Sequence, residues 1–133
     1  MTPLELGRKI LAQQPFSVLL GAELAHLAAG EAELRLPLRD DLLQQYGFAH
    51  GGAVAYLADN ALTFAGGSVL SNPITLEMKI NYIRPGVGET LIARAQAISS
   101  GRRQAVCECK VYALENGEEK LCAAAQGTIM SRD

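Results

Sequence analysis

The segment 51–67, GGAVAYLADNALTFAGG, restricts the fold of this 133-residue chain more than any other part of it. Apolar residues recur there three and four positions apart, which predicts one apolar face of a helix; they are Val54, Leu57, Ala58, Ala61, Leu62 and Ala65. Ala53 and Ala55 make much of the remaining surface apolar, and Gly66 and Gly67 supply an end. Such a helix is buried on most sides, so other elements have to wrap around it.

Strands are the elements predicted to surround this helix. Four runs after residue 73 look like strands, namely ITLEMKINYI, TLIARAQAI, QAVCECKVYA and KLCAAAQGTIM. The turns PGVG, SSGRR and ENGE separate them, and Asn-Gly is a strong hairpin signal. In the first run, Leu76, Met78, Ile80 and Tyr82 alternate with Thr75, Glu77, Lys79 and Asn81. Long strands joined by tight turns predict an antiparallel meander.

The first third of the chain adds a helix and a hairpin. Residues 2–13 form a predicted helix, with Thr2 as its N-cap and Glu5 completing a capping box. The stretch GAELAHLAAGEAELRLPL predicts two short strands around Gly30, the second with one polar face. No linker or repeat divides the chain. We therefore expect one α+β domain over residues 1–133, a curved antiparallel sheet around one central helix.

Composition excludes several classes of function. The net charge is −2 and both signs are interspersed, so the sequence predicts no basic surface for binding nucleic acid or a membrane. No run is long enough to span a bilayer, and the N-terminal segment lacks the features of a signal peptide, so we expect a cytoplasmic protein. The cysteine spacing fits no zinc site, and Cys107 and Cys109 read as small buried hydrophobes beside Ala105 and Val111. We expect no metal.

The start of the predicted central helix could bind a developing negative charge. Gly51 and Gly52 leave backbone N–H groups bare, at a helix end that carries unpaired donors and a partial positive charge. An oxyanion site can be built from such groups. Alternatively, the glycines only permit a tight turn. His50, just before them, could cap the helix, orient the loop or contact substrate.

Asp59 is the unexpected residue in this helix, because aspartate is a poor helix former and is costly to bury unpaired. It could face solvent, or accept a structural hydrogen bond from Asn60, Thr63 or a neighbouring strand. It could also act as a catalytic carboxylate. Thr63, one turn further on, could orient that carboxylate or bond back to its own helix.

Helix geometry separates the two candidate groups. Gly51 and Asp59 are eight residues apart, or about 12 Å along one helix axis. They cannot both touch one small reacting group within a single chain. If both act in one reaction, two antiparallel helices from different subunits have to lie side by side, which a symmetric dimer supplies twice.

The string YGFAHGGAVAYLADNAL, followed by LEMKINYIRPG and SSGRR, resembles the hotdog-fold acyl-CoA thioesterases of the phenylacetate-degradation (PaaI-like) group. The resemblance covers about residues 15–130. It is carried by Gly47, His50, Gly51, Gly52, Leu57-Ala58-Asp59 and Tyr82-Ile83-Arg84-Pro85. It implies the hotdog fold and the element order described above.

The resemblance also implies roles for individual residues. The Gly51 N–H would polarise the thioester carbonyl, and Asp59 of the opposing subunit would attack it or activate a water. His50 and Gly52 would shape the same loop. Gln44, with Gln45 beside it, stands where the family commonly has an asparagine that holds the nucleophile or water. Further site positions are a hydroxyl at Thr75 and the coenzyme A contacts Arg84, Pro85, Arg102 and Arg103.

The expected function is hydrolysis of an acyl-CoA thioester by a homodimer, which would pack further into a homotetramer. A positioned carboxylate and a backbone oxyanion site can suffice for this reaction without a cofactor, since coenzyme A is part of the substrate. Two alternatives stay open: a hotdog-fold hydratase or dehydratase, and a noncatalytic acyl-CoA-binding or sensor module. The sequence does not reveal the acyl group.

Overall fold

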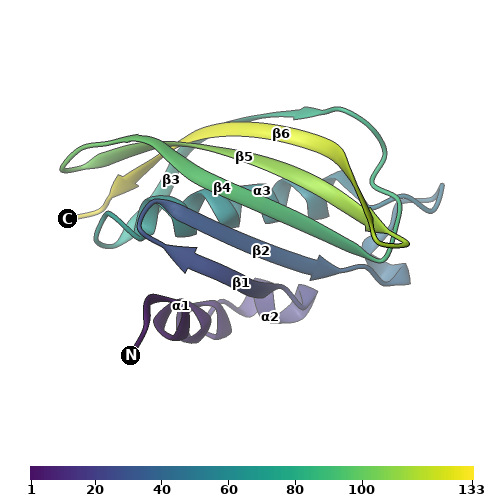
Figure 1. The fold of residues 1–133 in the computed structure, drawn as a ribbon, viewed down its shortest axis with the longest axis horizontal. Helices are drawn as coiled ribbons and strands as arrows, with labels where there is room; N and C mark the ends of the chain where they lie inside the picture. The colour runs from purple at the N-terminus through teal and green to yellow at the C-terminus, as the bar shows by residue number, and fades with distance from the viewer.

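The computed structural model describes residues 1–133. A six-stranded antiparallel sheet with strand order β1-β2-β4-β5-β6-β3 curves around the long helix α3, while α1 and α2 lie beside β1 (Figure 1). The elements are α1 (Pro3–Ala12), α2 (Pro15–Leu20), β1 (Glu23–Ala28), β2 (Glu31–Pro37), the 3₁₀ helix η1 (Asp40–Leu42), α3 (Gly51–Gly67), β3 (Pro73–Tyr82), β4 (Thr90–Ser100), β5 (Gln104–Glu115) and β6 (Glu118–Ser131). This arrangement confirms the hotdog fold expected from the sequence.

The N-terminal region contains one predicted helix and one that was not predicted. At α1 the capping box is formed, since the Thr2 hydroxyl accepts from the Glu5 amide at 3.1 Å and the Glu5 carboxylate accepts from the Thr2 amide at 3.3 Å. The short helix α2 begins at Pro15 and ends at Gly21, whose φ of 86° is left-handed. Proline at a helix start and glycine just past its end are the usual boundary residues.

The meander prediction is right for three strands and wrong for β3. Strands β4, β5 and β6 follow one another, and Asn116 and Gly117 turn the chain between the last two with φ of 52° and 80°. PGVG, however, does not make a hairpin of β3 and β4. Strand β3 pairs with β6, so the chain crosses the sheet before β4 begins, and the other edge of β3 is unpaired.

Small side chains bring the sheet close to α3. Ala58, Ala61 and Ala65 are fully buried in the core. At Gly66 a Cβ atom would lie 2.7 Å from the Cβ of Ile129, closer than two carbon atoms can pack. All three cysteines are buried, as expected of small hydrophobes, and burial raises the pKa of the Cys109 thiol to about 12.

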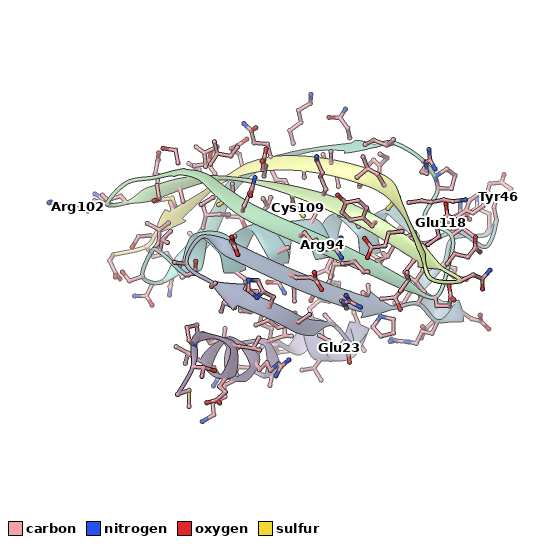
Figure 2. All side chains as sticks on the ribbon, viewed as in Figure 1. Glu23, Tyr46, Arg94, Arg102, Cys109 and Glu118 are labelled. Carbon is pink, nitrogen blue, oxygen red and sulfur yellow. The ribbon has the colours of Figure 1, made fainter.

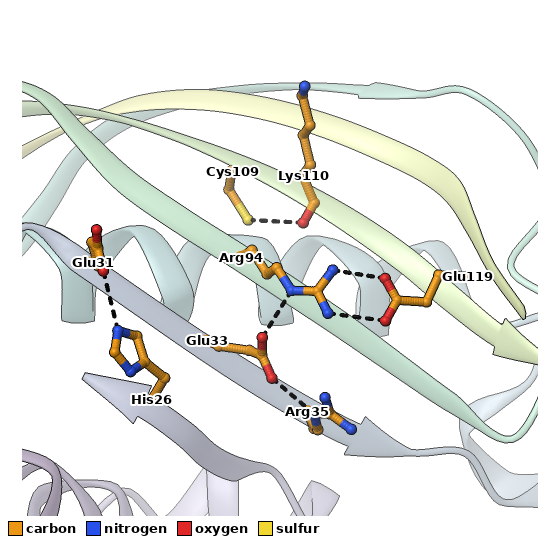
Figure 3. A network of polar contacts seen from close by, with 8 residues as sticks. All are labelled: His26, Glu31, Glu33, Arg35, Arg94, Cys109, Lys110 and Glu119. Carbon is orange, nitrogen blue, oxygen red and sulfur yellow. Dashed lines mark hydrogen bonds and ion pairs between the residues drawn. The ribbon is translucent and has the colours of Figure 1, made fainter. Parts of the chain in front are cut away.

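The outer face of the sheet is polar and held by charge pairs (Figure 3). Arg94 makes a bidentate ion pair with Glu119 at 2.7 and 2.9 Å and also reaches Glu33 at 2.8 Å. Arg35 binds the other Glu33 oxygen at 2.9 Å. Burial by itself would raise the pKa of Glu33, but the two arginines outweigh it and hold that pKa below its ordinary value. The polar face expected for the second strand is therefore confirmed.

Candidate active site

The Asp59 carboxylate is held by the neighbouring edge strand. The Thr75 hydroxyl donates to Asp59 Oδ1 at 2.6 Å, and the Thr63 and Thr75 hydroxyl oxygens are 2.9 Å apart. Thr63 also donates to the Asp59 backbone carbonyl at 2.9 Å. Asp59 Oδ2 has no partner within the chain. Since no buried side-chain oxygen lacks a partner, this second oxygen is accessible. One carboxylate oxygen is positioned and the other is free.

A β-bulge brings Thr75 to the helix. If the alternation in the sequence were unbroken, Leu76 and Met78 would lie on one face of the strand and Thr75 on the other face. In the structure the register with β6 shifts between Thr75 and Glu77, so Thr75 and Met78 both face inward. Leu76 is correspondingly 54% exposed and does not share the inner face with Met78, as unbroken alternation would require. A bulge inserts one unpaired residue and re-aims the side chain next to it.

Asp59 opens into a polar hollow between α2 and α3. The hollow is lined by Gln13, Gln14, Pro15, Phe16, Ser17, Tyr56, Asp59, Asn60 and Thr63. The α3 members form the row i, i+3, i+4, i+7, which is one helix face. The sequence analysis named Asp59, Asn60 and Thr63 but missed Tyr56 and the common face, although four polar residues at that spacing in an otherwise apolar helix were the available signal. It had no signal for the side of the hollow built by α2.

At the N-terminus of α3 only one of the two glycine amides is free. His50 is the N-cap, and its Nδ1 accepts from the Gly52 amide at 2.8 Å. No hydrogen bond within the chain uses the Gly51 amide. Because Nδ1 is an acceptor here, a neutral His50 ring carries its proton on Nε2. The helix start therefore presents two free donors, the Gly51 N–H and the His50 Nε2–H.

The loop before the helix contains the glutamine candidates. The Gln44 side-chain oxygen accepts from the Tyr46 amide, and the Gln44 amide donates to the Phe48 carbonyl at 2.9 Å. Gln44 thus shapes the turn through its oxygen and keeps its side-chain nitrogen unpaired. Gln45 is exposed.

The arginine candidates lie at opposite ends of the molecule. Arg84 and Pro85 follow β3 and line a shallow hollow with Phe48, and the Ala49 amide donates to the Gly86 carbonyl at 2.9 Å. This places them beside the loop that leads into α3. Arg102 and Arg103 form the β4–β5 tip, at the far end from Tyr46 (Figure 2). A single chain does not bring the two groups together.

Gly51 and Asp59 lie on one uninterrupted helix, so they are about 12 Å apart along its axis. The Tyr82 hydroxyl donates to the Gly51 carbonyl at 3.2 Å and ties the helix start to the end of β3. The free edge strand carries exposed apolar side chains, at 46% for Ile74, 54% for Leu76 and 57% for Tyr82. Within one chain the two candidate groups do not form a common site.

Two further observations concern metals and membranes. No group of three or more His, Cys, Asp or Glu side chains is arranged to hold a metal ion. None of the helices combines the length and the apolar character needed to cross a lipid bilayer.

Comparison with known proteins identifies relatives over the whole chain. The family model "Thioesterase superfamily" matches residues 46–120. The structure is similar to that of a thioesterase family protein from Silicibacter pomeroyi, with a TM-score of 0.92 and 33% identity over 97% of each chain. The acyl-coenzyme A thioesterase PaaI of Escherichia coli is 28% identical over 81% of this chain and 76% of its own length. The medium/long-chain acyl-CoA thioesterase YigI of the same species is 26% identical over 94% and 90%.

Proposed function

The chain belongs to the thioesterase superfamily and is a thioester hydrolase, and from that premise we propose that it hydrolyses an acyl-CoA thioester to a free acid and coenzyme A. The single observation that carries the proposal is the state of Asp59. A carboxylate with one oxygen fixed by Thr75 and the other accessible is suited to attack a carbonyl or to activate a water.

In the proposed reaction the Gly51 N–H donates to the thioester carbonyl oxygen as it becomes negative. Asp59 of the opposing subunit either attacks the carbonyl carbon or takes a proton from the attacking water. The C–S bond then breaks, and coenzyme A leaves as a thiolate that takes up a proton. If Asp59 is the nucleophile, this step leaves an acyl–Asp59 anhydride, which water cleaves to release the acid and restore the carboxylate. In both routes water supplies the second oxygen of the acid. His50 Nε2–H and the Gln44 side-chain nitrogen are the remaining donors for positioning carbonyl or water.

We further propose that the active unit is a homodimer. The unpaired edge of β3 and its exposed apolar side chains support pairing between the β3 strands of two chains. The α3 helices would then lie antiparallel, and Gly51 of one chain would approach Asp59 of the other. The same symmetry moves Arg102 and Arg103 to the end where the other chain's Arg84 and Pro85 lie, where coenzyme A phosphates could bind.

Assembly into a homotetramer and a cytoplasmic location complete the proposal. The tetramer follows from the resemblance, and light scattering would distinguish it from the dimer. The three buried free cysteines support a reducing compartment such as the cytoplasm.

Substitution of Asp59 tests the proposed chemistry. Asp59→Asn keeps the size of the side chain but removes its charge, and should lower kcat at least about 100-fold. The assay is thiol release from a panel of aryl-CoA and medium-chain acyl-CoA substrates. Asp40→Asn is the matched control, because Asp40 is exposed and lies outside both α3 and the hollow that contains Asp59. Turnover by Asp59→Asn close to that of the control would remove Asp59 from the mechanism.

The shared site has its own test. A Gly51→Pro chain and an Asp59→Asn chain carrying different affinity tags are co-expressed, and the mixed dimer is purified. If each site takes Gly51 from one chain and Asp59 from the other, one of the two sites is intact and about half of the wild-type activity returns. If each site lies within one chain, both sites are defective and no activity returns.

A further inference from the structure

Two consecutive glycines begin α3, and the first of them carries the proposed oxyanion donor. Gly51 and Gly52 have no side chains to restrict them, and glycine gives a backbone more conformational freedom than any other residue. A donor stabilises a developing negative charge best when it is held in place before the reaction. The direction of the Gly51 N–H therefore depends on contacts that restrict the peptide groups on both sides of it.

Hydrogen bonds fix both of these peptide groups. In the group before Gly51, the His50 carbonyl accepts from two amides of the first helical turn, at 2.9 and 3.2 Å. In the group after it, the Gly52 amide donates to His50 Nδ1 at 2.8 Å, and the Gly51 carbonyl accepts from the Tyr82 hydroxyl at 3.2 Å. Of these partners, Tyr82 is the one that comes from outside the helix and its cap.

Tyr82 is itself anchored to the sheet. It is the last residue of β3 and pairs with Ala123 of β6, and the next two amides of the chain both donate to the Cys122 carbonyl, at 2.8 and 3.3 Å. The Tyr82 ring also lies against Gly51, since a Cβ atom at Gly51 would be 3.6 Å from the nearest ring carbon. One side chain thus connects the start of α3 to a paired strand by a hydrogen bond and a van der Waals contact.

The hydrogen bond from Tyr82 contributes more to orientation than to stability. Tyr82 is 57% exposed, so its hydroxyl would bond water if the Gly51 carbonyl moved away. Exchanging a bond to water for a bond within the protein gives only a small net gain in free energy. A displacement of a reacting or stabilising group by about 1 Å, in contrast, can cost a large factor in rate.

We infer that Tyr82 is a positioning residue for the thioesterase reaction. Its hydroxyl holds the Gly51 carbonyl, and through that peptide group it orients the Gly51 N–H toward the oxygen that becomes negative. This inference rests on the proposed function. Tyr82 acts through Gly51 and takes no part in making or breaking bonds.

Tyr82→Phe tests the role of the hydroxyl, because it keeps the ring against Gly51 and removes only the hydrogen bond. In the thiol-release assay kcat should fall at least about threefold, the effect of losing one neutral hydrogen bond. KM should stay within about twofold and the melting temperature should not change, since the donor acts in the transition state. Tyr112→Phe is the matched control, because Tyr112 packs against Arg94 on the outer sheet face.

Two results of this assay would overturn the inference and leave the proposed function standing. One is equal kcat for Tyr82→Phe and Tyr112→Phe. The other is a loss of kcat in Tyr82→Phe that is accompanied by a lower melting temperature, which would indicate a structural role.

A second measurement asks whether Tyr82 acts through Gly51. Tyr82→Phe is combined with Gly51→Pro, which keeps the Gly51 carbonyl and lacks the N–H. The kcat of the double variant should equal that of Gly51→Pro within about twofold, because the donor that Tyr82 orients is already gone. If Tyr82→Phe lowers kcat by the same factor in both backgrounds, the inference is wrong. Wild-type turnover by Gly51→Pro alone would instead remove the Gly51 N–H from the proposed function, and the role of Tyr82 with it.

Discussion

Replacing Gly51 with proline would delete one backbone hydrogen from the proposed oxyanion site and nothing else that the fold uses. The Gly51 amide makes no hydrogen bond in the chain, and Gly51 is the first residue of α3. Proline is favoured at that position because its missing N–H is not needed there. His50 has φ −61° and ψ 136°, which is the conformation that a residue before proline prefers. The substitution should therefore leave the helix and the fold intact.

The expected loss of activity follows from the role of the amide. Removing a single oxyanion donor costs about 3–4 kcal/mol in the transition state, or roughly 100- to 1,000-fold in kcat. Gly51→Ala is the matched control, because it retains the N–H while adding the same Cβ. That Cβ would lie 3.6 Å from the nearest atom of the Tyr82 ring, an ordinary contact. Gly51→Pro should therefore turn over about 100- to 1,000-fold more slowly than Gly51→Ala.

The assay is thiol release under saturating acyl-CoA, with thermal unfolding of both variants measured in parallel. Equal turnover of the proline and alanine variants, with unchanged melting temperatures, would show that the Gly51 hydrogen has no part in the reaction. A fall in melting temperature confined to the proline variant would instead show that our reading of the helix start is wrong.

Three further predictions concern the carboxylate, the outer sheet face and the core. Thr75→Val removes the hydroxyl bound to Asp59 at nearly constant shape and should reduce kcat about 10- to 100-fold, which is the effect of losing a charge-assisted hydrogen bond. Thr75→Ser keeps a hydroxyl and should retain most of the wild-type kcat. Equal kcat values for the two variants would exclude a positioning role for Thr75. The pKa of Glu33 is lowered in the folded state, so the unfolded chain takes up the proton first as the pH falls below the ordinary value of 4.5. The free energy of unfolding should therefore decline in that pH range, and it should decline less steeply in Glu33→Gln. Urea titration at several pH values measures both. Gly66→Ala forces a Cβ into Ile129 and should destabilise the fold by roughly 1–3 kcal/mol in the same titration, whereas a neutral result would mean that the sheet can move away.

The sequence predicted those parts of the fold that depend on local patterns. The central helix, the capping box at Thr2 and the Asn-Gly turn each arise from residues within a few positions of one another. The pairing of β3 with β6 instead of β4 is a long-range choice that no local pattern records. The bulge at Leu76 also depends on long-range pairing. The alternation of residues through this strand is unbroken in the sequence, and only the pairing with β6 interrupts it.

For the candidate site too, the sequence predicted the residues that a local pattern marks and missed those placed by tertiary contacts. Asp59 and Gly51 stood out as a charged residue in an apolar helix and as bare amides at its start. Helix α2 did not stand out, because its six residues are too few to show a periodicity and most of its apolar side chains are exposed. Ser17 bonds Tyr56 across 39 positions of sequence, so its role depends on a tertiary contact.

The position of Asp59 also explains how an apolar helix can contain a carboxylate. The sheet covers the side of α3 that carries Leu57, Ala61 and Ala65, and leaves the side with Asp59 partly exposed. A bulged threonine stabilises the carboxylate there, so the helix avoids the large cost of an unpaired buried charge. The same openness leaves a water-accessible surface above the acid. An acyl group could be shielded from water there only if another surface closed the hollow, and the unpaired, partly apolar edge of β3 lies next to it.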